Sequence, residues 1–230
     1  MTHKGTHNSV DYLLKTMQEL RAPDGCPWDA VQTAESLSPY ILEEACELID
    51  AIESGDPKLI MDELGDLLLQ VVFQAQIFNE QEQFSFHDVA QGIAEKLVRR
   101  HPHVFAQNSA EAKGKDLDKQ WEEIKRSEAT HNKTCLADHV PKHLPALQKA
   151  QKLITRAHKA NRQDELFTAG HKSTRPLLDT AQRIEAGQID EDSLGEALFQ
   201  LANLAHEAGI DAETSLRKKT RHTLERLDSK

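Results

Sequence analysis

The sequence predicts an all-α protein made of two tandem helical-bundle units, the second of them degenerate. Three observations support this fold class. Ten Gly and eight Pro are present among 230 residues, about 8% of the chain compared with roughly 12% in average proteins. Apolar residues recur every three or four positions, which is the spacing of one helix face. Part of the second half also repeats part of the first, so the helices fall into two related groups.

The first predicted elements are a helix over residues 9–21 and a loop over residues 22–28. The helix carries one apolar stripe, formed by Val10, Leu13, Leu14, Met17 and Leu20. The loop contains Pro23, Gly25 and Pro27, and these residues interrupt a helix because Pro lacks a backbone N–H and Gly is flexible.

A tight antiparallel helix hairpin is predicted next. Ser38 and Pro39 are typical of an N-cap followed by Pro at the first helical position, and the helix they start is closed by Gly55. Asp56 and Pro57 repeat the start signal at once, so a second helix is expected to run to about residue 80 and to pack back against the first.

The remaining helices follow from similar signals. Ser85 and Asp88 form a capping-box pattern that opens a helix ending near residues 99–102. The polar stretch 106–116 is expected to be a mobile loop, and residues 117–128 a helix. The segment 129–145 contains two prolines and few apolar residues, which indicates a linker. Further helices are expected over residues 146–160, 173–186, 191–208 and 211–228.

An internal repeat sets the predicted domain boundaries. Residues 64–70 (LGDLLLQ) align with residues 194–200 (LGEALFQ), and each copy is followed by a helix with basic residues near its end. The sequence therefore predicts a first unit over residues 1–128, a linker over 129–145 and a second unit over 146–230.

Composition excludes several classes of function. Asp and Glu outnumber Lys and Arg by 38 to 28, giving a net charge of −10, which disfavours nucleic-acid and anionic-membrane partners because both attract a basic face. No segment has the length and apolarity of a signal peptide or a membrane span. Three cysteines without a C-x-x-C motif indicate free thiols and a reducing cytoplasm. Neither common glycine-rich phosphate-binding motif is present.

Acidic residues gather on the predicted hairpin. Glu44 and Glu47 are three residues apart on its first helix, and Glu63 and Asp66 are three apart on its second, so each pair shares a helix face. Glu47 and Glu63 are each eight residues from Gly55, roughly 12 Å along the axis. Glu44 and Asp66 are each eleven residues from the same turn, so four carboxylates are expected to form a compact square.

Two interpretations of these acids are open. They could form a solvated face, as most helical Glu residues do. However, they border the apolar stripe and no basic residue is interleaved with them, so their repulsion calls for a cation. Oxygen ligands favour Mg²⁺, with Mn²⁺ as a substitute. A di-iron site would need Glu-x-x-His motifs, which the sequence lacks, and His101 and His103 fit a helix-terminus role better than a zinc pair.

Basic and aromatic residues complete the candidate site. Lys96 and Arg100 are four residues apart, with Arg99 beside them. They could simply stabilise the end of their helix, but next to a metal-binding group they would hold a phosphate chain. The two tryptophans, Trp28 and Trp121, offer the large surfaces on which a base could stack, and core packing is the alternative for Trp28.

The sequence resembles the MazG family of nucleoside triphosphate pyrophosphohydrolases, part of the all-α NTP pyrophosphatase superfamily. The resemblance covers about residues 9–128. It rests on these segments: Gly25-Cys26-Pro27-Trp28-Asp29 with Gln32-Thr33, Glu43-Glu44-x-x-Glu47, Glu63-Leu64-Gly65-Asp66, Lys96-Leu97-x-Arg99-Arg100-His101-Pro102-His103-Val104-Phe105, and Trp121-Glu122-x-Ile124-Lys125.

The resemblance implies Mg²⁺-dependent hydrolysis of nucleoside triphosphates to the monophosphate and pyrophosphate, by a homodimer. The implied metal ligands are Glu44, Glu47, Glu63 and Asp66, and Glu43 is implied to lie outside the direct ligands or to orient the attacking water. The candidate substrate-binding residues are Lys96, Arg99, Arg100, Trp28, Trp121 and Lys125.

The second unit departs from this pattern. Alignment on the repeat places Ser193 where Glu63 stands and Glu196 where Asp66 stands, while Thr180 and Arg183 occupy the likely places of Glu44 and Glu47. The second copy is therefore expected to be structural or dimer-forming. Two alternatives to the enzyme remain: a weakly active or inactive scaffold or nucleotide sensor that retained the metal site, and a purely structural dimer whose acids are solvated.

Overall fold

The computed structural model describes residues 9–105, 117–128, 140–166, 175–188 and 190–228. These residues form helices, turns and bends, with no strand among them. This content confirms the all-α class predicted from the sequence. The chain divides into two compact units, Met1–Ser127 and Glu128–Lys230. The predicted linker falls partly on residues 129–139 and the predicted mobile loop on residues 106–116, both outside the described residues. None of the described helices combines the length and apolarity needed to cross a bilayer.

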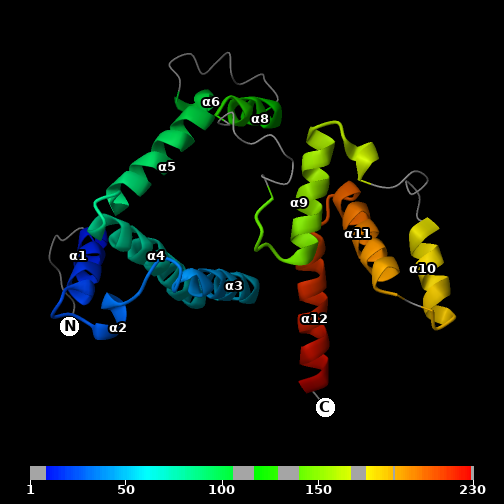
Figure 1. Cartoon of the computed structure of the whole chain (residues 1–230), viewed down its shortest axis with the longest axis horizontal. Coiled ribbons are helices and arrows are strands. Elements are labelled where there is room, and N and C mark those ends of the chain that lie inside the picture. Colours follow the sequence, from blue (N-terminus) through cyan, green and yellow to red (C-terminus); the bar gives the residue numbers. More distant parts are fainter. Residues whose placement is uncertain (1–8, 106–116, 129–139, 167–174, 189, 229–230) are drawn as a thin grey trace. The chain divides into compact units, whose positions relative to one another are not determined.

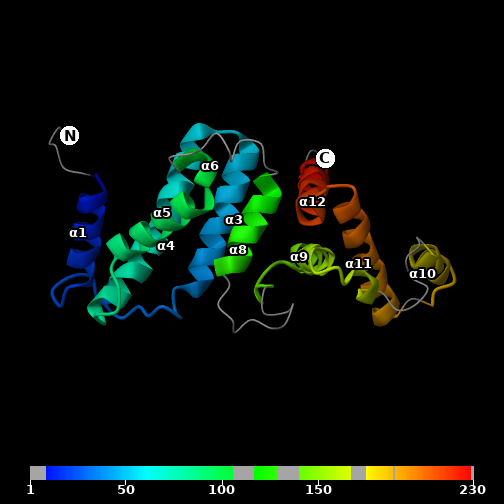
Figure 2. The same ribbon diagram turned by 90° about the horizontal axis from the view of Figure 1, so that it is seen from above.

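The first unit is organised around one long helix, α4, which packs against α1, α3 and α5. Its helices are α1 (Ser9–Arg21), α2 (Pro27–Ala30), α3 (Ser38–Ser54), α4 (Pro57–Glu80), α5 (Phe86–Arg100), α6 (Pro102–Phe105) and α8 (Leu117–Glu128). Figure 1 shows α4 at the centre of this unit, and in both views α3 lies alongside it (Figure 2).

The hairpin of α3 and α4 forms largely as the sequence predicts. Gly55 ends α3 with φ +75°, a left-handed conformation that favours glycine. The Asp56 side chain then accepts a 2.8 Å hydrogen bond from the Lys58 backbone N–H and caps α4. The predicted start of α3 was wrong by one residue. Leu37 is the N-cap, while Ser38 is already helical and donates its hydroxyl to the Ala34 carbonyl at 3.1 Å.

Two further boundaries were tested by the structure. The capping box is confirmed, because the Ser85 and Asp88 side chains each bond the other residue's backbone N–H at the start of α5. The loop predicted over residues 22–28 was wrong at its end. Pro27 begins the short helix α2, since Pro is well tolerated in the first helical turn, where its missing N–H costs no hydrogen bond.

The core of the first unit lies at the C-terminal half of α4. It is built from the buried side chains of Met17, Leu37, Val72, Phe73 and Ile77. The carboxylates of Glu63 and Asp66 lie in the N-terminal half of α4 and are thus separated from this core. The core fixes α4, and α4 in turn fixes the position of the hairpin.

Arg21 ties three elements to this core. Its guanidinium donates to both carboxylate oxygens of Glu80, at 2.9 and 2.7 Å, and to the Asp29 carbonyl at 2.6 Å. It also lies over the Phe73 ring, 5.3 Å from the centroid. These hydrogen bonds hold the pKa of Glu80 below its usual value. Arg21 therefore links the end of α1 to α2 and to the end of α4.

Arg21→Ala is expected to destabilise the first unit by about 1–3 kcal/mol, because it removes a buried side chain together with its hydrogen bonds to Glu80 and to the Asp29 carbonyl. The free energy of unfolding from urea titration measures this effect. Lys15→Ala is the matched control, since Lys15 forms only an exposed pair with Glu19 at 3.6 Å and should change stability by less than about 0.5 kcal/mol. Equal effects of the two substitutions would contradict the assigned role of Arg21.

Helix α5 diverges from the hairpin. Within the described residues it packs against α4 and α6 but not against α3. Figure 1 shows α4 and α5 opening away from each other from the short connection that joins them. The far end of α5, which carries the basic residues, therefore lies away from the hairpin of the same chain.

The second unit repeats the burial pattern of the first. Its elements are α9 (Ala146–Lys159), the short 3₁₀ helix η2 (Gln163–Glu165), α10 (Arg175–Glu185), α11 (Glu191–Glu207) and α12 (Ala212–Asp228). Gln70 of α4 and Gln200 of α11 are both buried, and so are Val72 and Ala202. The two members of each pair occupy equivalent positions when the sequence repeat is aligned, so α11 is the counterpart of α4.

Candidate metal and nucleotide site

Three carboxylates come together on the α3–α4 hairpin. Glu44 of α3 and Glu63 and Asp66 of α4 each offer one carboxylate oxygen, and these oxygens all lie within 4.8 Å of one another. Glu44 and Glu63 are half-buried, whereas Asp66 is exposed. The antiparallel turn at Gly55 brings residues from the two helices to the same level, so local capping signals place the acids. These three residues are called the acid group below.

The remaining acids of the sequence-based square lie at the edge of this group. Glu47 is exposed and is not one of the three, yet its charge contributes to the raised pKa of both Glu44 and Glu63. Glu43 is also exposed, and its charge raises the pKa of Glu44 slightly. The structure thus brings together three of the four acids, with Glu47 and Glu43 near enough to act electrostatically.

The acid group lacks internal compensation. One carboxylate oxygen of Glu63, Oε2, is buried without a hydrogen-bond partner in the described part of the chain. Burial, followed by the neighbouring carboxylates, raises the pKa values of Glu63 and Glu44. Buried carboxylate oxygens are normally hydrogen-bonded or bound to a cation. An all-oxygen donor set with an unpartnered oxygen fits Mg²⁺ or Mn²⁺.

Mg²⁺ is expected to raise the melting temperature more near pH 8 than near pH 4. Since the pKa values of Glu44 and Glu63 are raised above 4.5 in the folded chain, their contribution to stability is present below that value. It is lost as pH rises through the raised values, because the charges then repel one another. A cation removes this repulsion only when the carboxylates are ionised. Thermal melts with and without Mg²⁺ test this, and an equal Mg²⁺ effect at both pH values would contradict it.

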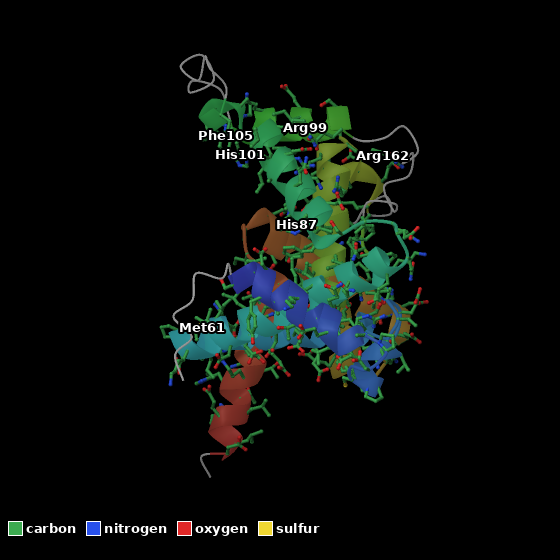
Figure 3. The ribbon with its side chains drawn as sticks, turned by 90° about the vertical axis from the view of Figure 1, so that its left-hand side faces the viewer. Met61, His87, Arg99, His101, Phe105 and Arg162 are labelled. Atoms are coloured by element: carbon green, nitrogen blue, oxygen red, sulfur yellow. The ribbon has the colours of Figure 1, made fainter. Side chains whose placement is uncertain are left out.

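The candidate phosphate-binding cations lie on α5. Lys96 and Arg99 are exposed, while Arg100 is half-buried and its guanidinium lies 5.3 Å from the Trp121 ring centroid. Figure 3 shows Arg99 at the far end of α5, clearly separated from Met61 of the hairpin. The structure therefore does not bring these cations to the acid group of the same chain.

An aromatic cluster that sequence reasoning missed surrounds the end of α5. His101 lies edge-on to Trp121, with ring centroids 5.1 Å apart, and its Nδ1 donates to the Leu97 carbonyl at 2.6 Å. His103 follows, 5.5 Å from His101, and its own Nδ1 is buried without a hydrogen-bond partner in the described residues. The signal was the H-P-H motif, which was interpreted only as a helix terminus. The side chain of Lys125 lies outside what the structure describes.

Trp28 occupies a different place from Trp121. It belongs to α2, is 53% exposed, and meets Tyr40 of α3 edge to face at 6.3 Å between ring centroids. This exposure disfavours core packing as its role within one chain. Trp28 and Tyr40 thus form an aromatic surface next to the start of α3, on the helix that also carries Glu44.

The second unit has a cavity at the counterpart of the acid group, with different chemistry. The cavity is about 610 Å³, and its lining includes Thr180, Arg183, Ser193 and Glu196. The Thr180 hydroxyl donates to the Ser193 carbonyl at 3.3 Å, and Arg183 forms a 3.1 Å ion pair with Asp190. Hydroxyls and a guanidinium replace acids here, and among the described residues of this unit no group of three potential metal ligands forms.

Comparison with known proteins places the chain among pyrophosphohydrolases. Residues 32–105 match the model of the MazG nucleotide pyrophosphohydrolase domain, a range that contains the hairpin and α5. A nucleoside triphosphate pyrophosphohydrolase of Escherichia coli (strain K12) is 41% identical over 92% of this chain and 82% of its own length.

Two further relatives agree. The nucleoside triphosphate pyrophosphohydrolase/pyrophosphatase MazG of Thermotoga maritima is 37% identical over 94% of this chain and 82% of its own length. A nucleoside triphosphate pyrophosphohydrolase of Mycolicibacterium smegmatis is 35% identical over 88% of this chain and 60% of its own length. With the all-α hairpin, the acid group and this extent of similarity, the chain belongs to the MazG nucleotide pyrophosphohydrolase family.

Proposed function

We propose that the protein hydrolyses nucleoside triphosphates to the nucleoside monophosphate and pyrophosphate, using the acid group of its first unit and Mg²⁺. The observation that carries the proposal is the acid group itself, in which half-buried carboxylates and a Glu63 oxygen without a partner among the described residues favour a divalent cation. The names of the full-length relatives support the reaction class.

The acidic residues of the proposed site would bind the metal and orient the attacking water. Glu44, Glu63 and Asp66 would hold the metal, with Glu47 beside them, and Mn²⁺ could replace Mg²⁺. The bound metal would neutralise phosphate charge and lower the pKa of an attacking water. Glu43, outside the acid group, would orient that water by accepting a hydrogen bond from it.

The remaining candidate residues would bind the nucleotide. Lys96 and Arg100, with Arg99 adjacent, would bind phosphate oxygens and stabilise the negative charge that develops on them. Trp121, which already stacks with Arg100, would contact the base, with Lys125 of the same helix nearby in sequence. Trp28 offers a second stacking surface. Stacking accepts every base, so discrimination among bases would need a polar contact in addition.

We further propose that the protein works as a homodimer in the cytoplasm. Both helices of the hairpin expose large apolar side chains, among them Ile41, Ile52, Leu64 and Leu68, and extended exposed apolar surface marks interaction sites. Both described cysteines, Cys26 and Cys46, are free thiols, in keeping with a reducing compartment.

The alternative function is a nucleotide sensor that keeps the metal site without turnover. It is favoured by the second unit, where Thr180 and Ser193 replace acids. A sensor predicts Mg²⁺-dependent nucleotide binding with no product, whereas a purely structural dimer predicts neither.

Pyrophosphate release from the eight standard ribo- and deoxyribonucleoside triphosphates, with Mg²⁺ and with EDTA, tests the proposal. We expect Mg²⁺-dependent pyrophosphate and nucleoside monophosphate in equal amounts. Release of orthophosphate without pyrophosphate would refute the reaction, and binding measured by calorimetry without any product would establish the sensor.

A further inference from the structure

We propose that Gln70 of α4 is a positioning residue of the metal site, and that its side-chain oxygen accepts a hydrogen bond from a water molecule of the hydrated cation. Gln70 is not a member of the acid group. The inference rests on the metal site of the proposed function, but it does not depend on turnover, because metal binding can be measured without nucleotide.

Gln70 lies between the acid group and the core on one face of α4. Glu63, Asp66 and Gln70 are spaced three and four residues apart, so they share a face of the helix. Phe73 and Ile77 continue that face and belong to the buried core. Gln70 is 7% exposed, whereas Asp66 is exposed. Gln70 is therefore the first buried residue of this face after the acids.

The Gln70 side chain contains a polar atom without compensation. Its Oε1 is buried and has no hydrogen-bond partner among the described residues. A buried amide oxygen without a donor costs free energy, so such atoms in native proteins are normally bonded to protein groups or to water. Phe73 and Ile77, which follow on this face, are apolar and offer no donor. The ionised carboxylates before it offer only acceptors. A hydrated cation held by the acid group would supply the missing donor.

Helix geometry directs the Gln70 side chain toward the acids. Side chains on an α-helix lean toward its N-terminus, so each residue covers the turn before its own. Asp66 lies one turn before Gln70, and Glu63 lies two turns before it. Glu63 Oε2 also lacks a partner within the described part of the chain. Both oxygens would be satisfied at once if a cation with its water molecules occupied the acid group.

The internal repeat shows how far an amide at this position reaches. Gln200 of α11 is the counterpart of Gln70, and Glu196 is the counterpart of Asp66. Gln200 is also buried, and its Nε2 donates to Glu196 Oε1 at 3.1 Å. An amide at this position can therefore reach the acid one turn earlier. The second unit forms no group of three potential metal ligands among its described residues, and there the amide serves the acid alone.

The coordination chemistry of Mg²⁺ suits a residue of this kind. Mg²⁺ keeps several water molecules when it binds protein carboxylates. Water on a cation is a hydrogen-bond donor, and the side-chain oxygen of Gln70 is an acceptor, so the two are complementary. Groups that hydrogen-bond around a metal fix the orientation of its ligands, and their loss weakens metal binding by about 10–100-fold.

Gln70→Met tests the assignment, because it keeps the length of the side chain and removes the amide. Calorimetry with Mn²⁺ and no nucleotide should show binding about tenfold weaker than in the wild-type protein. The melting temperature in EDTA should be unchanged or higher, since an unpartnered buried oxygen is removed. Unchanged Mn²⁺ affinity, with or without a lower melting temperature, would overturn the proposal and leave Gln70 a purely structural role.

Activity provides a second readout that separates Gln70 from a direct metal ligand. In Gln70→Met, the Mg²⁺ concentration that gives half of the maximal pyrophosphate release should rise about tenfold. At saturating Mg²⁺, kcat should recover to within about threefold of wild type. A loss of kcat that added Mg²⁺ does not restore would overturn the assignment of Gln70 to metal positioning.

Gln200→Met is the matched control at the equivalent position of the repeat. Because the Gln200 amide bonds to Glu196, its removal should lower the melting temperature in EDTA and leave Mn²⁺ affinity unchanged. Equal losses of Mn²⁺ affinity in Gln70→Met and Gln200→Met would overturn the proposal, since the effect would then not be specific to the first unit.

Gln70→Glu keeps an acceptor oxygen at the same distance from the backbone, and it decides the question if Gln70→Met does not fold. At pH 8 it should bind Mn²⁺ at least as tightly as the wild-type protein, and weaker binding would overturn the proposal. A wild-type protein that binds Mn²⁺ but releases no pyrophosphate would refute the proposed function alone, and these affinities would still decide the role of Gln70. Absence of Mn²⁺ binding by the wild-type protein would refute both.

Discussion

Glu63→Gln is expected to reduce pyrophosphate release by about 10³-fold or more, because the metal's contribution to transition-state stabilisation amounts to several kcal/mol. Glu63 is one of the three members of the acid group, and one of its oxygens is buried with no hydrogen-bond partner among the described residues. Gln keeps its size but removes the negative charge. The loss should appear in kcat, and added Mg²⁺ should restore little of it.

The fold should survive this substitution. Burial and neighbouring carboxylates raise the pKa of Glu44, and removing the Glu63 charge takes away one of these repulsions, so the melting temperature without metal should be unchanged or higher. Asp62→Asn is the matched control, since Asp62 is the preceding acid on α4 but lies outside the acid group. It should keep turnover within about threefold. Retained activity in Glu63→Gln would exclude this site.

Lys96→Gln has the second largest expected effect, a loss of about 10²-fold in kcat/KM. Its side chain is exposed in one copy and makes no contribution to the core, so the loss would come from weaker stabilisation of phosphate charge. The Mg²⁺-dependent rise in melting temperature should be kept without nucleotide, because the carboxylates themselves are intact.

Lys58→Gln provides the control for charge alone. Lys58 is also exposed, and it lies in the first turn of α4, outside the acid group and outside the candidate phosphate-binding residues of α5. It should leave kcat/KM within about threefold. Equal losses for Lys96→Gln and Lys58→Gln would mean that overall charge, and not a phosphate contact, accounts for the effect.

Local sequence signals predicted the elements better than their arrangement. The αL conformation of Gly55 and the cap of Asp56 are consequences of local backbone chemistry. These two residues therefore predicted the hairpin and its register. The end of α1 at Arg21 was also predicted, but its pairing with Glu80, far along the chain, was not. That pairing depends on how α1 packs against α4, which no local pattern specifies.

The candidate site, too, was predicted where it depends on local sequence and not where it depends on packing. Counting residues from Gly55 predicted that acids of α3 and α4 would meet, and Glu44, Glu63 and Asp66 do so. The exposed position of Glu47 depends on how the two helices cross and on its side-chain direction, which residue counts do not give. The divergence of α5 could not be predicted either, because the helix pattern fixes its apolar face but not what covers that face.

The net charge of −10 also gains a structural explanation. Part of the acidic excess is concentrated in one group that lacks ion pairs among the described residues, so it favours a divalent cation. A bound cation reverses the local sign of the field, which would let an acidic protein accept an anionic substrate. In the second unit Arg183 forms an ion pair with Asp190, so the corresponding position does not call for a divalent cation.

Mn²⁺ binding by matched substitutions in the two units tests the central claim most directly. Asp66→Asn removes a member of the acid group, while Glu196→Gln removes its counterpart at the equivalent position of the second repeat. With Mn²⁺ as the probe in calorimetry, Asp66→Asn should weaken binding at least about tenfold, and Glu196→Gln should leave it unchanged. Unchanged binding in Asp66→Asn, or loss of binding in Glu196→Gln, would contradict a metal site held by the first unit.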